Sequence, residues 1–184
     1  MNSVLICDDD RPTRLLVRQL LTGQGYTIHE AADGQQAWNL LQTENVSLLL
    51  TDWSMPEVDG LELCRRIREA ETDRYTYVVM FTAKTGERDL LAAMDAGVDD
   101  YLTKPVKREQ LLARLRVGNR ILTLLARKRQ LESLIPICMY CKKARNDQDY
   151  WQQLDAFLAE NTAAQLSHGI CPECLAEHHP EYKP

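Results

Sequence analysis

Short runs of apolar residues occur along the first part of the chain, and each ends in a polar residue. Three of them are residues 3–7 before Asp8, 47–51 before Asp52, and 77–81 before Thr82. These runs are almost continuously apolar, which is typical of strands buried on both faces of a parallel sheet. A shorter fourth run closes with Tyr101 and Lys104. The pattern predicts parallel strands with polar residues at their carboxyl ends.

The segments between these runs place apolar residues at helical spacing. Leu16 and Leu20 follow the first run, and Ala37 and Leu41 precede the second. Residues four apart lie on one face of a helix, which can pack against a sheet. Strand and helix thus alternate about five times, so we expect an α/β fold with a parallel sheet.

The carboxyl ends of parallel strands meet at one edge of the sheet, where such folds place their chemistry. Asp8, Asp9 and Asp52 should therefore lie close together. Clustered carboxylates repel one another unless a cation or a proton offsets their charge. Oxygen ligands of this kind suit Mg²⁺, which binds through one or two carboxylates and often a phosphate. The alternative is that residues 8–10 simply cap the following helix.

The other polar residues of this edge favour phosphoryl transfer. An aspartate can become a covalent acyl phosphate, so Asp52 is the candidate acceptor. Lys104 supplies a positive charge that can hold a phosphoryl oxygen, and Thr82 offers a hydroxyl group to another. The whole set in this order, and not any single residue, supports the hypothesis.

Residues 1–122 resemble the receiver domain of bacterial response regulators. The stretch 51–63, TDWSMPEVDGLEL, is close to the chemotaxis type. The resemblance implies a flavodoxin-like, doubly wound sheet of five parallel strands in the order 2-1-3-4-5. It also implies a sensor histidine kinase as phosphoryl donor, so we expect a two-component regulator and not an enzyme.

The same resemblance implies a role for each candidate residue. Asp52 would be phosphorylated, and Lys104 would precede a cis peptide bond to Pro105. Thr82 and Tyr101 would rearrange on phosphorylation. The implied Mg²⁺ ligands are three carboxylates and one backbone carbonyl, from Asp8, Asp9, Asp52 and Ser54 respectively.

A long helix should follow the sheet, because residues 107–135 contain no proline. Positions recur there at alternating spacings of four and three residues, the seam pattern of a coiled coil. They are Val117, Ile121, Leu124, Lys128, Leu131 and Ile135. We expect this helix to join two copies of the chain; a solitary amphipathic helix is the alternative. A second stripe starting at Leu111 and Leu115 should pack on the sheet.

This predicted helix is basic within an acidic chain. The formal net charge is −5, yet residues 103–135 carry nine basic and two acidic side chains. A basic helix can bind nucleic acid, which makes a DNA-binding transcriptional regulator one alternative. Acidic flanks and the lack of a helix-turn-helix pattern disfavour it. A downstream protein target of unknown identity is the expected partner.

The segment 136–184 contains two cysteine pairs, each with two intervening residues. They are Cys138 with Cys141, and Cys171 with Cys174. Two such pairs supply the four thiolates of a closed tetrahedral Zn²⁺ site. So short a segment buries little apolar surface, so a metal would stabilise it. We expect a small zinc-binding α+β module that binds a protein; a redox-responsive cysteine switch is the alternative.

Other residues of this segment have structural interpretations. Apolar residues at the spacing of one helical face should pack over the zinc site: Tyr150, Trp151, Leu154, Phe157 and Leu158. Asp147 or Asp149 is the candidate cap of that helix. Three histidines are substitute ligands should a cysteine be free: His168, His178 and His179. The stretch 167–172, SHGICP, resembles part of a short four-cysteine C-terminal module of bacterial signalling proteins.

The expected location is cytoplasmic. The amino terminus carries no signal-peptide pattern, and no apolar stretch is long enough to span a bilayer, so no membrane insertion is expected. In a reducing compartment, paired cysteines favour metal binding over stable disulfides. Cys7 and Cys64 fall within the predicted strand and helix, where we expect them to be small buried residues.

Overall fold

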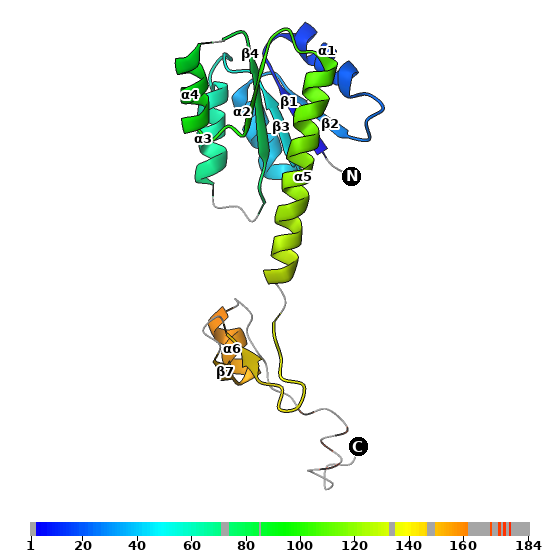
Figure 1. Cartoon of the computed structure of the whole chain (residues 1–184), viewed down its shortest axis with the longest axis vertical. Helices are drawn as coiled ribbons and strands as arrows, with labels where there is room; N and C mark the ends of the chain where they lie inside the picture. Colours follow the sequence, from blue (N-terminus) through cyan, green and yellow to red (C-terminus); the bar gives the residue numbers. More distant parts are fainter. Residues whose placement is uncertain are drawn as a thin grey trace. The chain divides into compact units, whose positions relative to one another are not determined.

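The computed structural model describes residues 3–70, 74–84, 86–132, 135–146 and 150–161, together with positions 170, 173, 175 and 177. The chain forms two compact units, residues 1–128 and residues 129–184. The first unit is a sheet flanked by helices (Figure 1). The second contains a two-stranded hairpin followed by a helix.

Five parallel strands form the sheet of the first unit, in the order β2-β1-β3-β4-β5. Their bounds are β1 Ser3–Cys7, β2 Thr27–Ala31, β3 Leu48–Thr51, β4 Tyr77–Thr82 and β5 Asp100–Thr103. Every residue of β1, β3 and β4 is buried, as continuous apolar runs predict. The predicted doubly wound α/β fold of the first unit and its strand order are confirmed.

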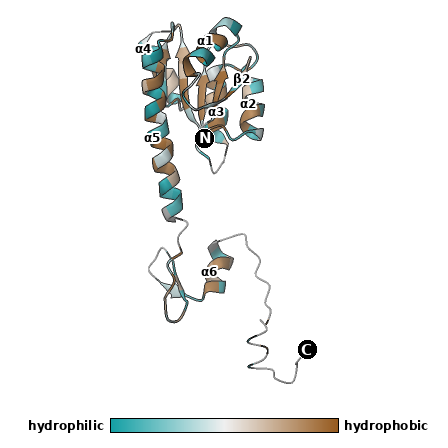
Figure 2. Ribbon diagram, turned by 90° about the vertical axis from the view of Figure 1, so that its right-hand side faces the viewer, coloured by the Kyte–Doolittle hydropathy of each residue, from teal (hydrophilic) through white to brown (hydrophobic). Residues whose placement is uncertain are grey.

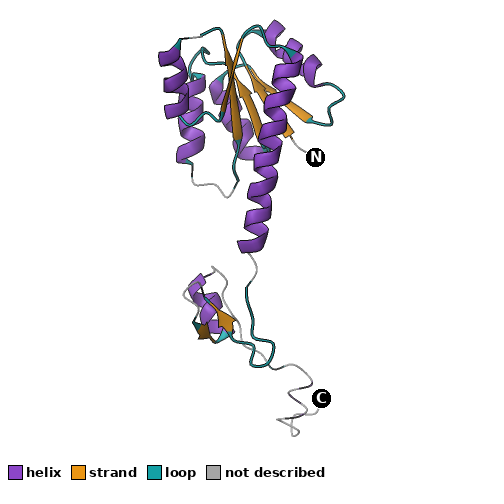
Figure 3. Ribbon diagram, viewed as in Figure 1, coloured by secondary structure: helices purple, strands orange, loops and turns teal. Residues whose placement is uncertain are grey.

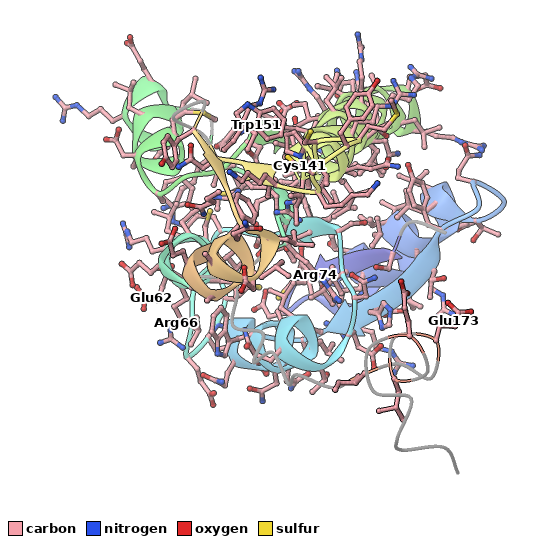
Figure 4. The ribbon with its side chains drawn as sticks, turned by 90° about the horizontal axis from the view of Figure 1, so that it is seen from below. Glu62, Arg66, Arg74, Cys141, Trp151 and Glu173 are labelled. Carbon is pink, nitrogen blue, oxygen red and sulfur yellow. The ribbon has the colours of Figure 1, made fainter. Side chains whose placement is uncertain are left out.

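Helices cover both faces of this sheet (Figure 3). They are α1 Arg11–Leu21, α2 Gly34–Thr43, α3 Gly60–Glu69, α4 Glu87–Asp95 and α5 Arg108–Glu132. Asp10 caps α1 by accepting a hydrogen bond from the Thr13 N–H, and this leaves Asp8 and Asp9 for another role. On α3, Glu62 and Arg66 form an ion pair of 3.0 Å one turn apart (Figure 4).

Two apolar clusters fix these helices to the sheet, and the sheet between them is the most hydrophobic part of the unit (Figure 2). One cluster joins α2, α3 and α4 to residues such as Leu49. The other joins α1 and α5 to the opposite face. On α1 the buried residues are Val17 and Leu21, whereas Leu16 is 45% exposed. Cys7 and Cys64 are buried, as predicted.

Helix α5 packs on the sheet through its first half. Leu111 and Leu115 are fully buried, which confirms the predicted inner stripe. A β carbon at Gly118 would lie 2.6 Å from the Tyr77 ring, so glycine allows the helix to approach β4 closely. This packing explains the one glycine in an otherwise helix-favouring segment.

The predicted coiled-coil seam on α5 needs correction at two positions. Ile121 packs against the apolar cluster of the first unit, because the helix still lies on the sheet at that point. Ile135 lies beyond the helix, which ends at Glu132. Val117 and Leu124 remain outward, 37% and 57% exposed.

Of the helices that the structure describes, none combines the length and the apolar character that a bilayer span requires.

The second unit contains β6 Ala144–Arg145, β7 Trp151–Gln152 and α6 Leu154–Asn161. The prediction that Tyr150 and Trp151 share a helical face with Leu154 is wrong. Both precede α6, because the chain first pairs antiparallel with β6. Tyr150 is 67% exposed. The candidate caps Asp147 and Asp149 lie outside the described residues.

Candidate functional site

Asp8, Asp9 and Asp52 meet at the carboxyl edge of the sheet, after β1 and β3. One carboxylate oxygen from each lies within 4.8 Å of the others. Asp8 is fully buried, Asp52 is 7% exposed, and Asp9 is exposed. Closely spaced carboxylate oxygens, two of them buried, fit a hard divalent cation such as Mg²⁺. Ser54 is exposed in the loop that follows Asp52.

Lys104 follows β5 and extends its ammonium group into this cluster. Its Nζ lies 2.7 Å from Asp8 Oδ2 and 3.1 Å from Asp52 Oδ2. Burial lowers the pKa of Lys104, but the hydrogen bonds to Asp8 and Asp52 outweigh burial and raise it overall. The peptide bond from Lys104 to Pro105 is cis, as predicted. The lysine is therefore held charged between two carboxylates that directly follow the neighbouring strands β1 and β3.

Asp52 is held in place by its backbone. Its N–H donates to the Cys7 carbonyl at 2.8 Å. The following loop folds back, so that the Gly60 N–H donates to the Trp53 carbonyl at 2.8 Å. A β carbon at Gly60 would lie 2.0 Å from the Asp52 carbonyl oxygen, so this approach requires glycine. Burial raises the pKa of Asp52, although the hydrogen bond from Lys104 lowers it.

Thr82 and Tyr101 lie on β4 and β5, at the same edge as the carboxylates. Thr82 is buried at the end of β4, and its Oγ1 accepts a hydrogen bond from the Lys84 N–H at 3.2 Å. The half-buried Tyr101 donates its hydroxyl proton to the Lys84 carbonyl. The structure thus brings both predicted switch residues to one loop.

Two residues that contact this site could not be predicted from the sequence. Arg14 on α1 donates from Nη1 to the Asp8 carbonyl at 2.6 Å and to the Asp9 carbonyl at 3.2 Å. Its Nε also lies 3.8 Å from Glu30 Oε2. Lys84 is the second missed residue. Arg14 contacts the backbone carbonyls of other residues, and Lys84 contacts its neighbours through its own backbone N–H and carbonyl. Every residue type has these backbone groups, so the sequence does not reveal such contacts.

The structure describes half of the predicted zinc ligands. Cys138 and Cys141 bracket a tight turn in which the Lys142 N–H donates to the Cys138 carbonyl at 3.0 Å. The Cys138 N–H donates to the Lys143 carbonyl at 2.8 Å. Backbone hydrogen bonds from Cys141 and Tyr140 lower the pKa of the half-buried Cys138 thiol. The other predicted ligands, Cys171 and Cys174, and the substitutes His168, His178 and His179 lie outside the described residues.

The part of the chain that forms this edge of the sheet matches a known protein family. The family described as response regulator receiver domain matches residues 4–116. Response regulator MprA of Mycobacterium ulcerans (strain Agy99) is 40% identical over 113 residues, covering 61% of this chain and 48% of that protein. Its namesake in Mycobacterium avium (strain 104) is 39% identical and covers 61% of this chain and 49% of that protein. The chain thus spans about half the length of these curated relatives.

Solved structures agree with the sequence relatives. Chemotaxis protein CheY4 of Vibrio cholerae is 29% identical, with a TM-score of 0.60 over 64% of this chain and 98% of that chain. The receiver domain of Francisella response regulator 1452 is 28% identical, with a TM-score of 0.61 over 65% and 98% of the two chains. The carboxylate cluster, Thr82, Tyr101 and Lys104 all fall within the family match. The chain therefore belongs to the response regulator receiver domain family.

Proposed function

We propose that this chain accepts a phosphoryl group on Asp52 from a sensor histidine kinase and passes the signal to a protein target. The observation that carries the proposal is the bridge from Lys104 to Asp8 and Asp52, at 2.7 and 3.1 Å. The bridge places a fixed cation beside a desolvated carboxylate, which is the environment that a transferring phosphoryl group requires. The chain is thus a phosphoryl acceptor and not an enzyme with a separate substrate.

In the proposed reaction an Asp52 carboxylate oxygen bonds to the phosphorus of a phosphohistidine. The phosphorus–nitrogen bond breaks, and the products are an acyl phosphate and free histidine. Asp8, Asp9 and Asp52, with the Ser54 carbonyl, would hold Mg²⁺, which neutralises phosphoryl charge when bound. Lys104 then exchanges its hydrogen bond to Asp52 for one to a phosphoryl oxygen.

The acceptor residue can be mapped directly. Phosphoramidate, whose phosphorus–nitrogen bond resembles that of phosphohistidine, should modify the protein in the presence of Mg²⁺. Borohydride reduces an acyl phosphate to an alcohol, so peptide mass spectrometry should find homoserine at position 52. Reduction at another aspartate, or an unchanged pattern in Asp52→Asn, would contradict the proposal.

The signal would leave through the loop that joins β4 to α4. New phosphoryl oxygens attract the hydroxyl of Thr82, which lies in contact with Lys84 of that loop. Movement of the loop and of Tyr101 changes the surface formed by α4, β5 and α5. A conformational change carries a signal only if a partner binds the two states differently, so a downstream protein target is part of the proposal.

For the C-terminal unit we infer a zinc site formed by Cys138, Cys141, Cys171 and Cys174. Support comes from the tight turn around the first pair and from the lowered pKa of Cys138, since a thiolate is the metal-binding form. Protein purified under reducing conditions should contain one zinc ion, and Cys138→Ser should lose it. Met139→Ser, in the same turn but 72% exposed, is the matched control.

The zinc assay also decides between metal binding and redox sensing. Full zinc content in Cys138→Ser would exclude the four-cysteine site. A wild-type protein without zinc that forms disulfides with peroxide would favour the redox-responsive regulator.

For α5 we infer self-association through its outward stripe. This stripe consists of the exposed apolar residues Val117 and Leu124, which lie seven residues apart and so on one face of the helix. Burial of this stripe against a second copy would remove it from water.

A further inference from the structure

Lys84 contacts other residues through three separate chemical groups. It follows β4, two residues after Thr82, in the loop that leads to α4. Its N–H donates to Thr82 Oγ1, and its carbonyl accepts from the Tyr101 hydroxyl. The side chain runs elsewhere, toward the loop after β3. One residue therefore touches both switch residues and a third element.

The third contact is with an aromatic ring. Lys84 Nζ lies 3.9 Å from the centroid of the Trp53 ring, within the range of a cation–π interaction. Trp53 follows the acceptor Asp52 directly and is 7% exposed. Its carbonyl is fixed by the Gly60 N–H at 2.8 Å. The ring is thus a rigid attachment point beside the acceptor.

Tyr101 is oriented inward: its ring packs against the apolar cluster of α2, α3 and α4, and its hydroxyl reaches the Lys84 carbonyl. From these contacts we infer that Lys84 is a positioning residue that links Trp53, beside the phosphorylation site, to this inward orientation of Tyr101. The ammonium group on the ring holds the loop, and the loop carbonyl holds the tyrosine hydroxyl. The inference rests on the proposed function for its role in signalling. We call the contacts of Lys84 with Trp53 and Tyr101 the clamp. The clamp is present in the unphosphorylated chain.

The competing explanation is simple packing. Lysine stems often cover aromatic rings without any role for the charge. Methionine at position 84 keeps an unbranched stem but removes the ammonium group, whereas arginine keeps a cation that can stack on the ring. Comparing Lys84→Met with Lys84→Arg therefore separates charge from coverage.

The experiment uses full-length protein labelled with 3-fluorotyrosine and observed by ¹⁹F NMR. Comparison with Tyr101→Phe assigns the Tyr101 resonance among the seven tyrosines. Removing the cation–π contact of this half-buried lysine should change the conformational ratio by about twofold to fivefold. In Lys84→Met, the ratio of inward to outward Tyr101 should fall by that amount, and Lys84→Arg should restore it. Lys107→Met, an exposed lysine just before α5, should not change it.

Two results would overturn the clamp. One is a Tyr101 spectrum in Lys84→Met identical to that of the wild type. The other is equal impairment in Lys84→Met and Lys84→Arg, since the charge would then be irrelevant.

A parallel sample treated with acetyl phosphate and Mg²⁺ keeps the clamp distinct from the proposed function. Intact mass gives the phosphorylated fraction of each protein, and the Tyr101 spectra are compared at equal phosphorylated fraction. The Tyr101 response to phosphorylation should be weakened in Lys84→Met alone. If the wild type takes up no phosphoryl group, the proposed function is wrong. The spectra of the untreated proteins still show whether Lys84 controls the orientation of Tyr101.

Discussion

At the scale of single residues, Arg14 has the clearest untested role. Its Nη1 holds the carbonyls of Asp8 and Asp9, at 2.6 and 3.2 Å, and so fixes the loop that carries two predicted metal ligands. Arginine forms such forked contacts because its donors lie in a rigid plane. We propose that Arg14 pre-organises these two carboxylates without being a metal ligand itself.

Arg14→Ala should raise the Mg²⁺ concentration needed for half-maximal phosphorylation by acetyl phosphate by about fivefold to tenfold. This effect is smaller than the full contribution of one hydrogen bond from a charged donor, because Arg14 acts on the carboxylates only through the loop backbone. Arg18→Ala is the matched control, because Arg18 also pairs with Glu30 but does not hold the acidic loop. Equal Mg²⁺ dependence in Arg14→Ala and wild type would exclude this role.

The ionised side chain of Asp52 should lower the free energy of unfolding when no metal is bound. Burial raises its folded-state pKa above the ordinary value of 3.8, so the ionised carboxylate disfavours folding at neutral pH. Asp52→Asn should therefore unfold at a higher temperature than wild type at pH 7. The difference should shrink as pH falls through the folded-state pKa, and vanish below 3.8, where both folded and unfolded carboxyls are protonated.

Thermal unfolding in EDTA across this pH range is the measurement. Asp8→Asn provides a comparison at the neighbouring carboxylate, and Mg²⁺ should remove most of the gain. A lower melting temperature for Asp52→Asn at pH 7 would show that the ion pair with Lys104 outweighs burial.

Most of the site could be predicted because its chemistry lies at strand ends. Asp8, Asp52 and Thr82 close apolar runs, and a parallel sheet brings such ends together. Arg14 and Lys84 could not be predicted in this way. Neither lies at the end of a strand, and their roles depend on the backbone path of two loops.

At the scale of elements, the fit of α5 on the sheet depends on Gly118. Its absent side chain leaves room for the Tyr77 ring and for Leu48, whose Cδ2 would lie 3.1 Å from a β carbon. Glycine weakens the helix by about 1 kcal/mol relative to alanine, so close packing must offset that cost. Gly118 thus lowers the helix propensity of α5 but allows the helix to contact β4.

Gly118→Ala should lower the free energy of unfolding of the first unit by about 1–2 kcal/mol. Overpacking against Tyr77 outweighs the gain in helix propensity. Thr123→Ala, at an exposed position of the same helix, should be neutral or slightly stabilising. Urea unfolding followed by circular dichroism measures both. A more stable Gly118→Ala would show that the ring moves aside at little cost.

The elements could be predicted where burial leaves a clear pattern, such as the continuous apolar runs of β1, β3 and β4. The pattern was less informative at partly buried positions. Ile121 has the spacing of a coiled-coil seam, yet it packs on the sheet. An apolar helix face with this spacing can pack against either a sheet or a second helix. Tyr150 and Trp151 fit a helical face, yet they enter a hairpin, because short strands carry no lasting alternation.

At the scale of the whole molecule, the receiver unit and the C-terminal unit are joined through α5, which crosses the boundary between them. A dimer formed by the outward stripe of this helix would hold two C-terminal units on one assembly. Leu124, rather than Ile121, is the position that tests this, because Ile121 also stabilises the receiver.

Leu124→Asp should weaken self-association by about tenfold or more, because it places a charge at an apolar interface. Sedimentation velocity over a range of protein concentrations measures the effect. Ala126→Asp, exposed and away from the seam by heptad spacing, should associate like the wild type. A wild-type protein that stays monomeric at all concentrations would contradict the dimer and leave the receiver chemistry unaffected.

The most direct test of the central claim is the intact mass of the protein after incubation with acetyl phosphate. With Mg²⁺, the wild type should gain the mass of one phosphoryl group, while EDTA or Asp52→Asn should prevent the gain. A wild-type spectrum without that species, or an equal gain in Asp52→Asn, would contradict phosphorylation of Asp52.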